Sequence, residues 1–183
     1  GQILTDTELK PLGTYSRNSN EYIVPHTTTD NRAIPWKLLK DIFVRVPVVA
    51  NAINNTSDFA VQAGYELDTS DDARKKIKKC EDEHNFELIQ DNIFNQMQIF
   101  GNCYLSTNRT ASEAKLLPPD TMYVIVDKNE GKLLGYVQIV SSDRKIYFKP
   151  DEIIHFKWND IGINFYGSSD ILPVLSTLTK MLN

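Results

Sequence analysis

The sequence predicts an α+β fold, with N-terminal helices packed on a mainly antiparallel sheet and one further helix at the C-terminus. In residues 35–100, apolar side chains recur every three or four positions, which is the period of a helix with one buried face. In residues 102–158, short apolar runs are separated by turn residues, as in antiparallel strands. Helices first and strands afterwards is an order typical of α+β proteins.

Composition and charge exclude several classes of protein. The 183 residues, 41% of them hydrophobic, suffice for one domain with its own core. The net charge of -4 argues against nucleic-acid binding by the chain as a whole. Cys80 and Cys103 lack further ligands at metal-binding spacing, so we expect two free thiols and no metal site. No apolar run reaches the roughly 20 residues of a membrane span.

Residues 1–34 are polar and rich in Thr and Asn, with little periodicity. Such a segment buries little surface, and we expect an extended or flexible N-terminal arm. The arm is either disordered or ordered against a neighbouring molecule. The α+β domain is then expected to span residues 35–183.

The first two helices are expected to begin at Pro35 and Pro47, because proline suits the first helical turn. The second helix should end at Gly64 and be followed by a short strand at residues 65–67. Its predicted apolar stripe consists of Val48, Val49, Ala52, Ile53, Phe59 and Ala60.

A third helix is expected after residues 69–72, which supply an N-cap and acidic residues at the positive helix end. It holds the one dense basic run of the chain, Arg74, Lys75, Lys76, Lys78 and Lys79. The run is either a contact for phosphates or an acidic partner, or a solvated face balanced by the acids at 81–83. The solvated face is the more common case.

A fourth, strongly amphipathic helix is expected at residues 86–100, capped by Asn85 and ended by Gly101. Strands are expected at residues 102–106, 115–117, 122–126, 134–140, 145–148 and 153–158. His155, in the last strand, is expected to bond a backbone group and to have no catalytic role. The final helix should start near Ser168, and its apolar pattern continues to the last residues, so we expect it to be cut short at 183.

The sequence contains no motif of a hydrolase, a P-loop or a dinucleotide site, and we assign no catalytic, cofactor-binding or metal-binding residue. Residues 167–169, before a helix start, could bind an anion through free N–H groups, although the same pattern serves as an ordinary N-cap. The aromatic residues lack the interleaved basic residues of RNA-binding sheets, which favours packing in the core or in an interface.

Six segments resemble, in order, the portal proteins of tailed dsDNA bacteriophages. The resemblance covers residues 36–182, and Cys103 stands where these proteins commonly have alanine. The segments are the helix and strand entry at 47–67, FGNCYL at 100–105, LPPDTM at 117–122, the returning strand at 131–140, FKPDEIIHF at 148–156, and YGSS at 166–169.

The resemblance implies the N-terminal wing region of a portal. Portals are dodecameric rings at one capsid vertex of the virion, assembled in the host cytoplasm, and viral dsDNA is packaged and ejected through their channel. Their partners are other copies of the portal, the major capsid protein, the terminase large subunit, and head-completion and tail adaptor proteins. The resemblance implies no enzyme activity, no cofactor and no membrane contact, and the family's stem, clip and crown regions are not matched here.

Subunit or shell contacts are expected at exposed aromatic and basic residues, namely Trp36, Phe165, Tyr166, Lys75, Lys76 and Lys79. Two alternatives stay open. One is an anion- or nucleotide-binding enzyme that uses the helix start at Gly167–Ser169. The other is a virion or nucleic-acid-binding adaptor that uses the Lys75–Lys79 helix.

Overall fold

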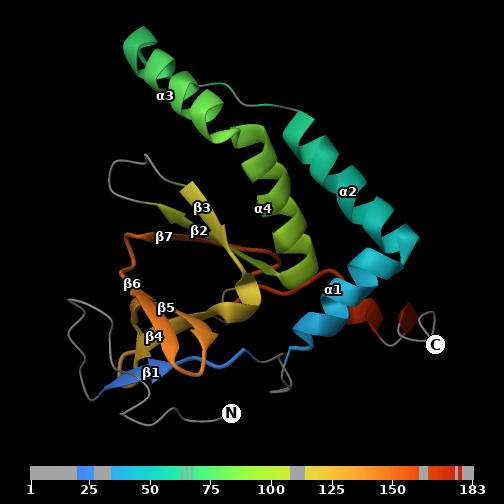
Figure 1. The fold of residues 1–183 in the computed structure, drawn as a ribbon, viewed down its shortest axis with the longest axis vertical. Coiled ribbons are helices and arrows are strands. Elements are labelled where there is room, and N and C mark those ends of the chain that lie inside the picture. The colour runs from blue at the N-terminus through green and yellow to red at the C-terminus, as the bar shows by residue number, and fades with distance from the viewer. Residues whose placement is uncertain are drawn as a thin grey trace.

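The computed structural model has four helices and two antiparallel sheets in the part of the chain it describes, which confirms the predicted α+β class (Figure 1). It describes residues 20–26, 34–107 apart from 63, 65 and 67, 114–160, and 165–178 apart from 176. Helix α4 lies between α2 on one side and the sheets on the other. No helix in these residues is long and apolar enough to cross a membrane.

The first two helices begin at the predicted prolines. Helix α1 (Trp36–Arg45) follows Pro35 and buries Leu39 and Ile42, one turn apart on the same face. Helix α2 (Pro47–Gln62) starts two residues after α1 ends, and the two helices pack against each other. The short strand predicted at residues 65–67 is not formed at Glu66, and its other two residues lie outside the described part.

The stripe predicted for α2 is wrong in part. Ile53 and Ser57 face α4, whereas Val48 and Phe59 are exposed by 62% and 78%. The reason is a polar contact in the interface between α2 and α4: Ser57 donates to Asn95 Oδ1 at 2.8 Å and accepts from the buried Gln98 amide at 3.0 Å. Because one buried position is a serine, an apolar pattern cannot identify the buried face.

Helices α3 (Asp71–His84) and α4 (Phe86–Phe100) are consecutive, with a bend at Asn85 (Figure 1). Ser70 caps α3 as expected, and Gly101 ends α4 with a left-handed φ of 75°. Asn85 differs from the prediction, since its side chain caps nothing. Its left-handed backbone (φ 49°) ends α3 and sets the bend into α4.

The strands form two sheets. The four-stranded sheet, in spatial order, contains β1 (Glu21–Ile23), β4 (Met122–Asp127), β5 (Leu133–Ser141) and β6 (Arg144–Phe148). The three-stranded sheet, in spatial order, contains β3 (Ala114–Leu117), β2 (Asn102–Thr107) and β7 (Ile153–Lys157). All six predicted strands after residue 100 are present, and every pairing in these sheets is antiparallel.

Strand β1 lies inside the predicted arm, where no strand was expected. It pairs with the far end of β4, Tyr22 opposite Val126, and the Val24 N–H donates to the Val124 carbonyl at 2.9 Å. Residues 20–24 are therefore bonded to the edge of the sheet. Ile34, the last residue of the predicted arm, is buried in the helical part of the core, and residues 1–19 and 27–33 lie outside the described part. The division at residue 34 stays a prediction.

The last helix does not start at Ser168. The backbone from Gly167 to Ser169 is irregular, and a short 3-10 turn, Leu172–Val174, precedes helical backbone at Leu175, Thr177 and Leu178. The Ser168 and Asp170 N–H groups donate to carbonyls of distant segments, so they do not belong to a first helical turn. The predicted continuation to residue 183 lies largely outside the described residues.

The core has two parts joined by one segment. The helical part contains Leu39, Ile42, Ile53, Ile99, Ile171 and Leu178. The sheet part contains Tyr104, Met122, Val124, Tyr136, Ile153 and Tyr166. Residues 166–171 supply Tyr166 to one part and Ile171 to the other, and therefore link the two.

We predict that Ile42→Ala lowers the free energy of unfolding by about 2–5 kcal/mol, because Ile42 is fully buried and its loss leaves a cavity. Val44→Ala on the same helix, where the side chain is 69% exposed, should change it by less than about 0.5 kcal/mol. Urea denaturation followed by circular dichroism measures both. Equal effects of the two substitutions would contradict the packing of α1.

Candidate functional site

Two glycine-containing segments, 65 residues apart in sequence, cross in close contact. A Cβ atom on Gly101 would lie 2.6 Å from the backbone carbon of Ser168, and one on Gly167 would overlap the carbonyl oxygens of Gly101 and Trp158. Any side chain at either position would separate the segments. We call this contact, with Asn102 and His155 beside it, the Gly101–Gly167 crossing.

The Asn102 side chain holds the crossing together and is fully buried. Its Nδ2 donates to the carbonyls of Phe100 at 3.2 Å and Gly167 at 3.3 Å. Its Oδ1 accepts from the Gly167 N–H at 2.8 Å and pairs with His155 Nε2 at 3.0 Å. Since Oδ1 can only accept, His155 must carry its proton on Nε2. The Asn102 amide thus binds both backbone segments of the crossing and determines the tautomer of His155.

The backbone after the crossing is bonded mainly to other segments of the protein. Its N–H groups donate as follows: Gly167 to Asn102 Oδ1, Ser168 to the Trp158 carbonyl, Asp170 to the Gln98 carbonyl, and Ile171 to Ser169 Oγ. An anion site needs free N–H groups at a helix start. The N–H groups of Gly167 and Ser168 are used and the predicted helix start is not formed, so the geometry does not support the anion-binding hypothesis for Gly167–Ser169.

His155 is surrounded by aromatic side chains of the core. Its ring stacks on Tyr104 with centroids 4.3 Å apart and meets the edge of Tyr136 at 5.8 Å. Burial lowers the pKa of His155 to about 3, and the positive charge of Lys157 acts in the same direction. Its partner is the Asn102 side chain and not the backbone group that we expected.

Of two further predicted contact residues, Tyr166 is buried, whereas Trp36 is half-buried and its role as a contact stays a prediction. Tyr166 is 8% exposed, donates to the Val24 carbonyl at 2.8 Å and accepts from the Val124 N–H at 3.0 Å. Burial raises its pKa. Trp36 packs at the edge of His26, with ring centroids 4.9 Å apart. The structure therefore corrects the interpretation of Tyr166, which fastens β1 to the core and has little surface to offer a partner.

His26 is the centre of the aromatic packing around β1. It stacks on Tyr123 at 4.3 Å and meets Tyr166 edge-on at 4.6 Å. Burial lowers the pKa of His26 to about 4, and the Met122 backbone partly offsets this shift. His26 is neutral at pH 7 and contributes to folding as an aromatic ring.

The remaining predicted contact residues are on the surface. Phe165 is 37% exposed, and Lys75, Lys76 and Lys79 are exposed on α3. The sequence of α3 contains five basic and five acidic residues, and Lys79 pairs with Glu83 at 3.6 Å. A helix with no net charge fits the solvated-face interpretation. The roles of these four residues as contacts stay predictions.

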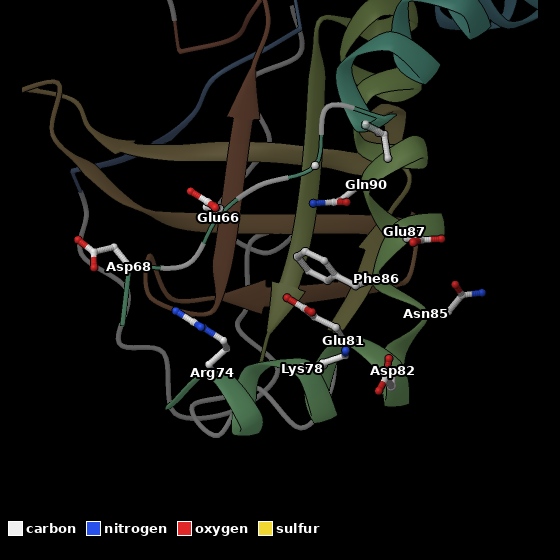
Figure 2. Close-up of a pocket in the computed structure, with 12 residues that line it drawn as sticks. Glu66, Asp68, Arg74, Lys78, Glu81, Asp82, Asn85, Phe86, Glu87 and Gln90 are labelled. Atoms are coloured by element: carbon white, nitrogen blue, oxygen red, sulfur yellow. The ribbon is translucent and has the colours of Figure 1, made fainter. Parts of the chain in front are cut away.

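An open hollow of about 1360 Å³ lies between the end of α2, the loop after it, α3 and the start of α4 (Figure 2). Glu66 and Asp68 line it from the loop, and Arg74 and Lys78 line it from α3. The lining has more acids than bases and no buried polar group aimed at a common point, so it selects no ligand. No group of three His, Cys, Asp or Glu side chains in the described residues could hold a metal.

Cys103 is a free and buried thiol. Burial raises its pKa to about 12, so the thiolate is not available for nucleophilic or redox chemistry at neutral pH. The prediction of a free thiol is confirmed at this position. The side chain of Cys80 lies outside the described residues.

No family model matches the sequence, and no curated protein has significant similarity to it. Solved structures do match the fold. A chain in the virion of a native gene transfer agent particle has a TM-score of 0.62 and 21% identity over 78% of this chain. Chains in the neck of the native particle with C12 symmetry and of the empty particle with C6 symmetry have TM-scores of 0.55 and 0.58, at 20% and 18% identity. At such identities the similarity establishes a shared fold, and this chain spans 40–41% of the length of these chains.

We predict that Gly167→Ala costs at least about 4 kcal/mol or prevents folding, because the new methyl group would overlap backbone atoms that cannot move aside. Gly131→Ala is the control. Its φ of 64° is also left-handed, but no atom lies within 4 Å of the new Cβ, so it should cost about 1–2 kcal/mol. Thermal unfolding of both variants tests this, and equal stabilities would refute the close approach.

We predict that the protein loses stability as the pH falls from about 7 to about 5. The unfolded chain binds protons at His26 and His155 near pH 6.5, whereas the folded chain binds them only near pH 4 and pH 3. Protonation therefore favours unfolding over this range, in which most carboxylates remain charged. Denaturation midpoints at several pH values provide the measurement. His26→Phe, which keeps an aromatic ring, should have a shallower pH dependence, and an unchanged slope would contradict the assignment.

Proposed function

We propose that this chain is the wing region of a portal protein in a phage-like particle. In this role it is a structural subunit of a ring at one capsid vertex and not an enzyme. Two independent lines support the proposal. The fold matches chains from gene transfer agent particles, two of them in necks with rotational symmetry. The sequence, separately, resembles portals in six ordered segments.

One observation carries the proposal beyond a shared fold. Three of the resembling segments each supply a part of the Gly101–Gly167 crossing: FGNCYL supplies Gly101 and Asn102, FKPDEIIHF supplies His155, and YGSS supplies Gly167. Each segment alone is a weak signal. Their convergence on one buried amide gives a physical reason for the three to occur together, which a chance resemblance would not have.

The proposed role is mechanical. A closed ring needs two unlike faces on every subunit, and each face must hold its position relative to the other. The crossing links the helices to the sheets through backbone contacts and buried hydrogen bonds, which suits a rigid spacer between neighbours. Passage of viral dsDNA, docking of the terminase large subunit and attachment of head-completion and tail adaptor proteins are then properties of the whole ring, and the major capsid protein is the proposed outer neighbour.

The two alternative functions gain no support from the geometry. The N–H groups of Gly167 and Ser168 donate to Asn102 and Trp158, and no helix starts at Ser168, which leaves an anion-binding enzyme without its proposed site. A nucleic-acid-binding adaptor would need a net positive face. The basic run of α3 is matched by an equal number of acids in the same helix.

The proposal predicts rings with rotational symmetry and a central channel when the longest natural chain containing this sequence is purified. Negative-stain electron microscopy with two-dimensional class averages tests this, and twelve-fold symmetry is the expectation from the family resemblance. A protein that stays monomeric at low and high salt, at every concentration reached, would refute the proposed function.

A further inference from the structure

The four-stranded sheet has a second face, opposite the one that contributes to the sheet part of the core. Side chains alternate between the two faces along a strand, and Met122, Val124 and Tyr136 belong to the sheet part of the core. Ile125 and Val137, which alternate with them, therefore point to the other side. We define the outer sheet face as the residues that share this side on β1, β4, β5 and β6, namely Ile23, Ile125, Val137, Ile139 and Tyr147.

The outer sheet face lies at one end of a stack of layers. Helix α4 packs on β2 and β7 of the three-stranded sheet (Figure 1). The three-stranded sheet in turn meets the four-stranded sheet through shared core residues, such as Tyr104 from β2 and Val124 from β4. The order of layers is therefore α4, the three-stranded sheet, the four-stranded sheet, and then the outer sheet face.

The centre of the outer sheet face is nevertheless buried. Ile125 and Val137 are 1% and 0% exposed, and neither belongs to the helical or the sheet part of the core. Lys145, which pairs with Ile139 at the edge of this face, is 8% exposed. Antiparallel sheets commonly leave one face in water. Full burial at these positions requires a further layer on top of the sheet.

The segment at residues 1–19 has the position, the length and the composition of that layer. The chain enters the sheet at Asn20, whose carbonyl accepts from the Lys128 N–H at 2.7 Å, so the segment is tethered at the sheet edge. Four strands are about 15 Å across, and a segment of this length reaches about 60 Å when extended. Its apolar residues are Ile3, Leu4, Leu9, Leu12 and Tyr15.

The charges of the segment also suit this face. A lysine at the edge of an apolar surface is stable when an acidic group is close to it. Asp6 and Glu8 lie between the apolar residues of the segment, and can therefore approach Lys145 when those residues contact the sheet.

We propose that residues 1–19 lie across the outer sheet face of their own chain and cover it. The tether at Asn20 gives this segment a high effective concentration at its own sheet. A second copy has no such advantage, and the net charge of -4 on each copy disfavours its approach. The inference is independent of the proposed function, because it concerns a contact within one chain.

Photo-crosslinking with two isotopes tests both the contact and its direction. A benzophenone amino acid replaces Leu9 in the longest natural chain containing this sequence, and nitrogen-14 and nitrogen-15 forms are unfolded, mixed and refolded together. Light should couple position 9 to β4, β5 or β6, and mass spectrometry should find a single isotope in each coupled pair of peptides. Pairs that mix the two isotopes would place the segment on a neighbouring copy and overturn the inference, as would crosslinks that miss these three strands.

Limited proteolysis provides the second measurement. Leu9→Asp combined with Leu12→Asp should make trypsin cleave after Arg17 at least about tenfold faster, because cleavage follows the population in which the segment is detached. Thr5→Asp combined with Thr7→Asp is the matched control. It adds the same charge at polar positions and should change the cleavage rate by less than about twofold. Equal rates for the two double variants would overturn the inference.

Discussion

The buried amide of Asn102 is the interaction on which the rest of the structure depends. It lies beside Gly101 and Gly167, where two backbone segments are too close for a side chain at either glycine, and it bonds groups of both segments. An unsatisfied buried amide would cost more than a typical hydrogen bond contributes, so the four bonds of Asn102 act as a set. Without them, the segment that joins the helical and sheet parts of the core loses its link to the start of β2, and only its bonds to Trp158, Gln98 and the residues around β1 and β4 remain.

The regular elements could be predicted because their signals are local. Proline at the start of α1 and α2, Gly101 at the end of α4, and alternation in the strands all act within a few residues. The failures involve partners that are distant in sequence. Strand β1 is only three residues long and exists because β4 offers it an edge. The buried face of α2 depends on Ser57, whose hydrogen bonds to α4 have no hydrophobic signature.

The candidate site, too, could be predicted only in part from the sequence. Its sequence motifs could be identified, and so could the structural character of His155. The geometry that joins the motifs could not be predicted, because it depends on the contact between Gly167 and Gly101, which are distant in sequence. Tyr166 illustrates the limit: an aromatic residue between glycine and a polar loop suggests an exposed contact, but two hydrogen bonds to β1 and β4 hold it inside. The exposure of Val48 and Phe59 on α2 could not be predicted either, since apolar residues are normally assigned to the core.

The hydrogen bond from Tyr166 to the Val24 carbonyl has a consequence for biosynthesis. The two residues are 142 positions apart, and the same late segment also supplies Ile171 to the helical core. A ribosome makes the N-terminal residues first. Neither part of the core can therefore be completed on a nascent chain until residues 166–171 have emerged.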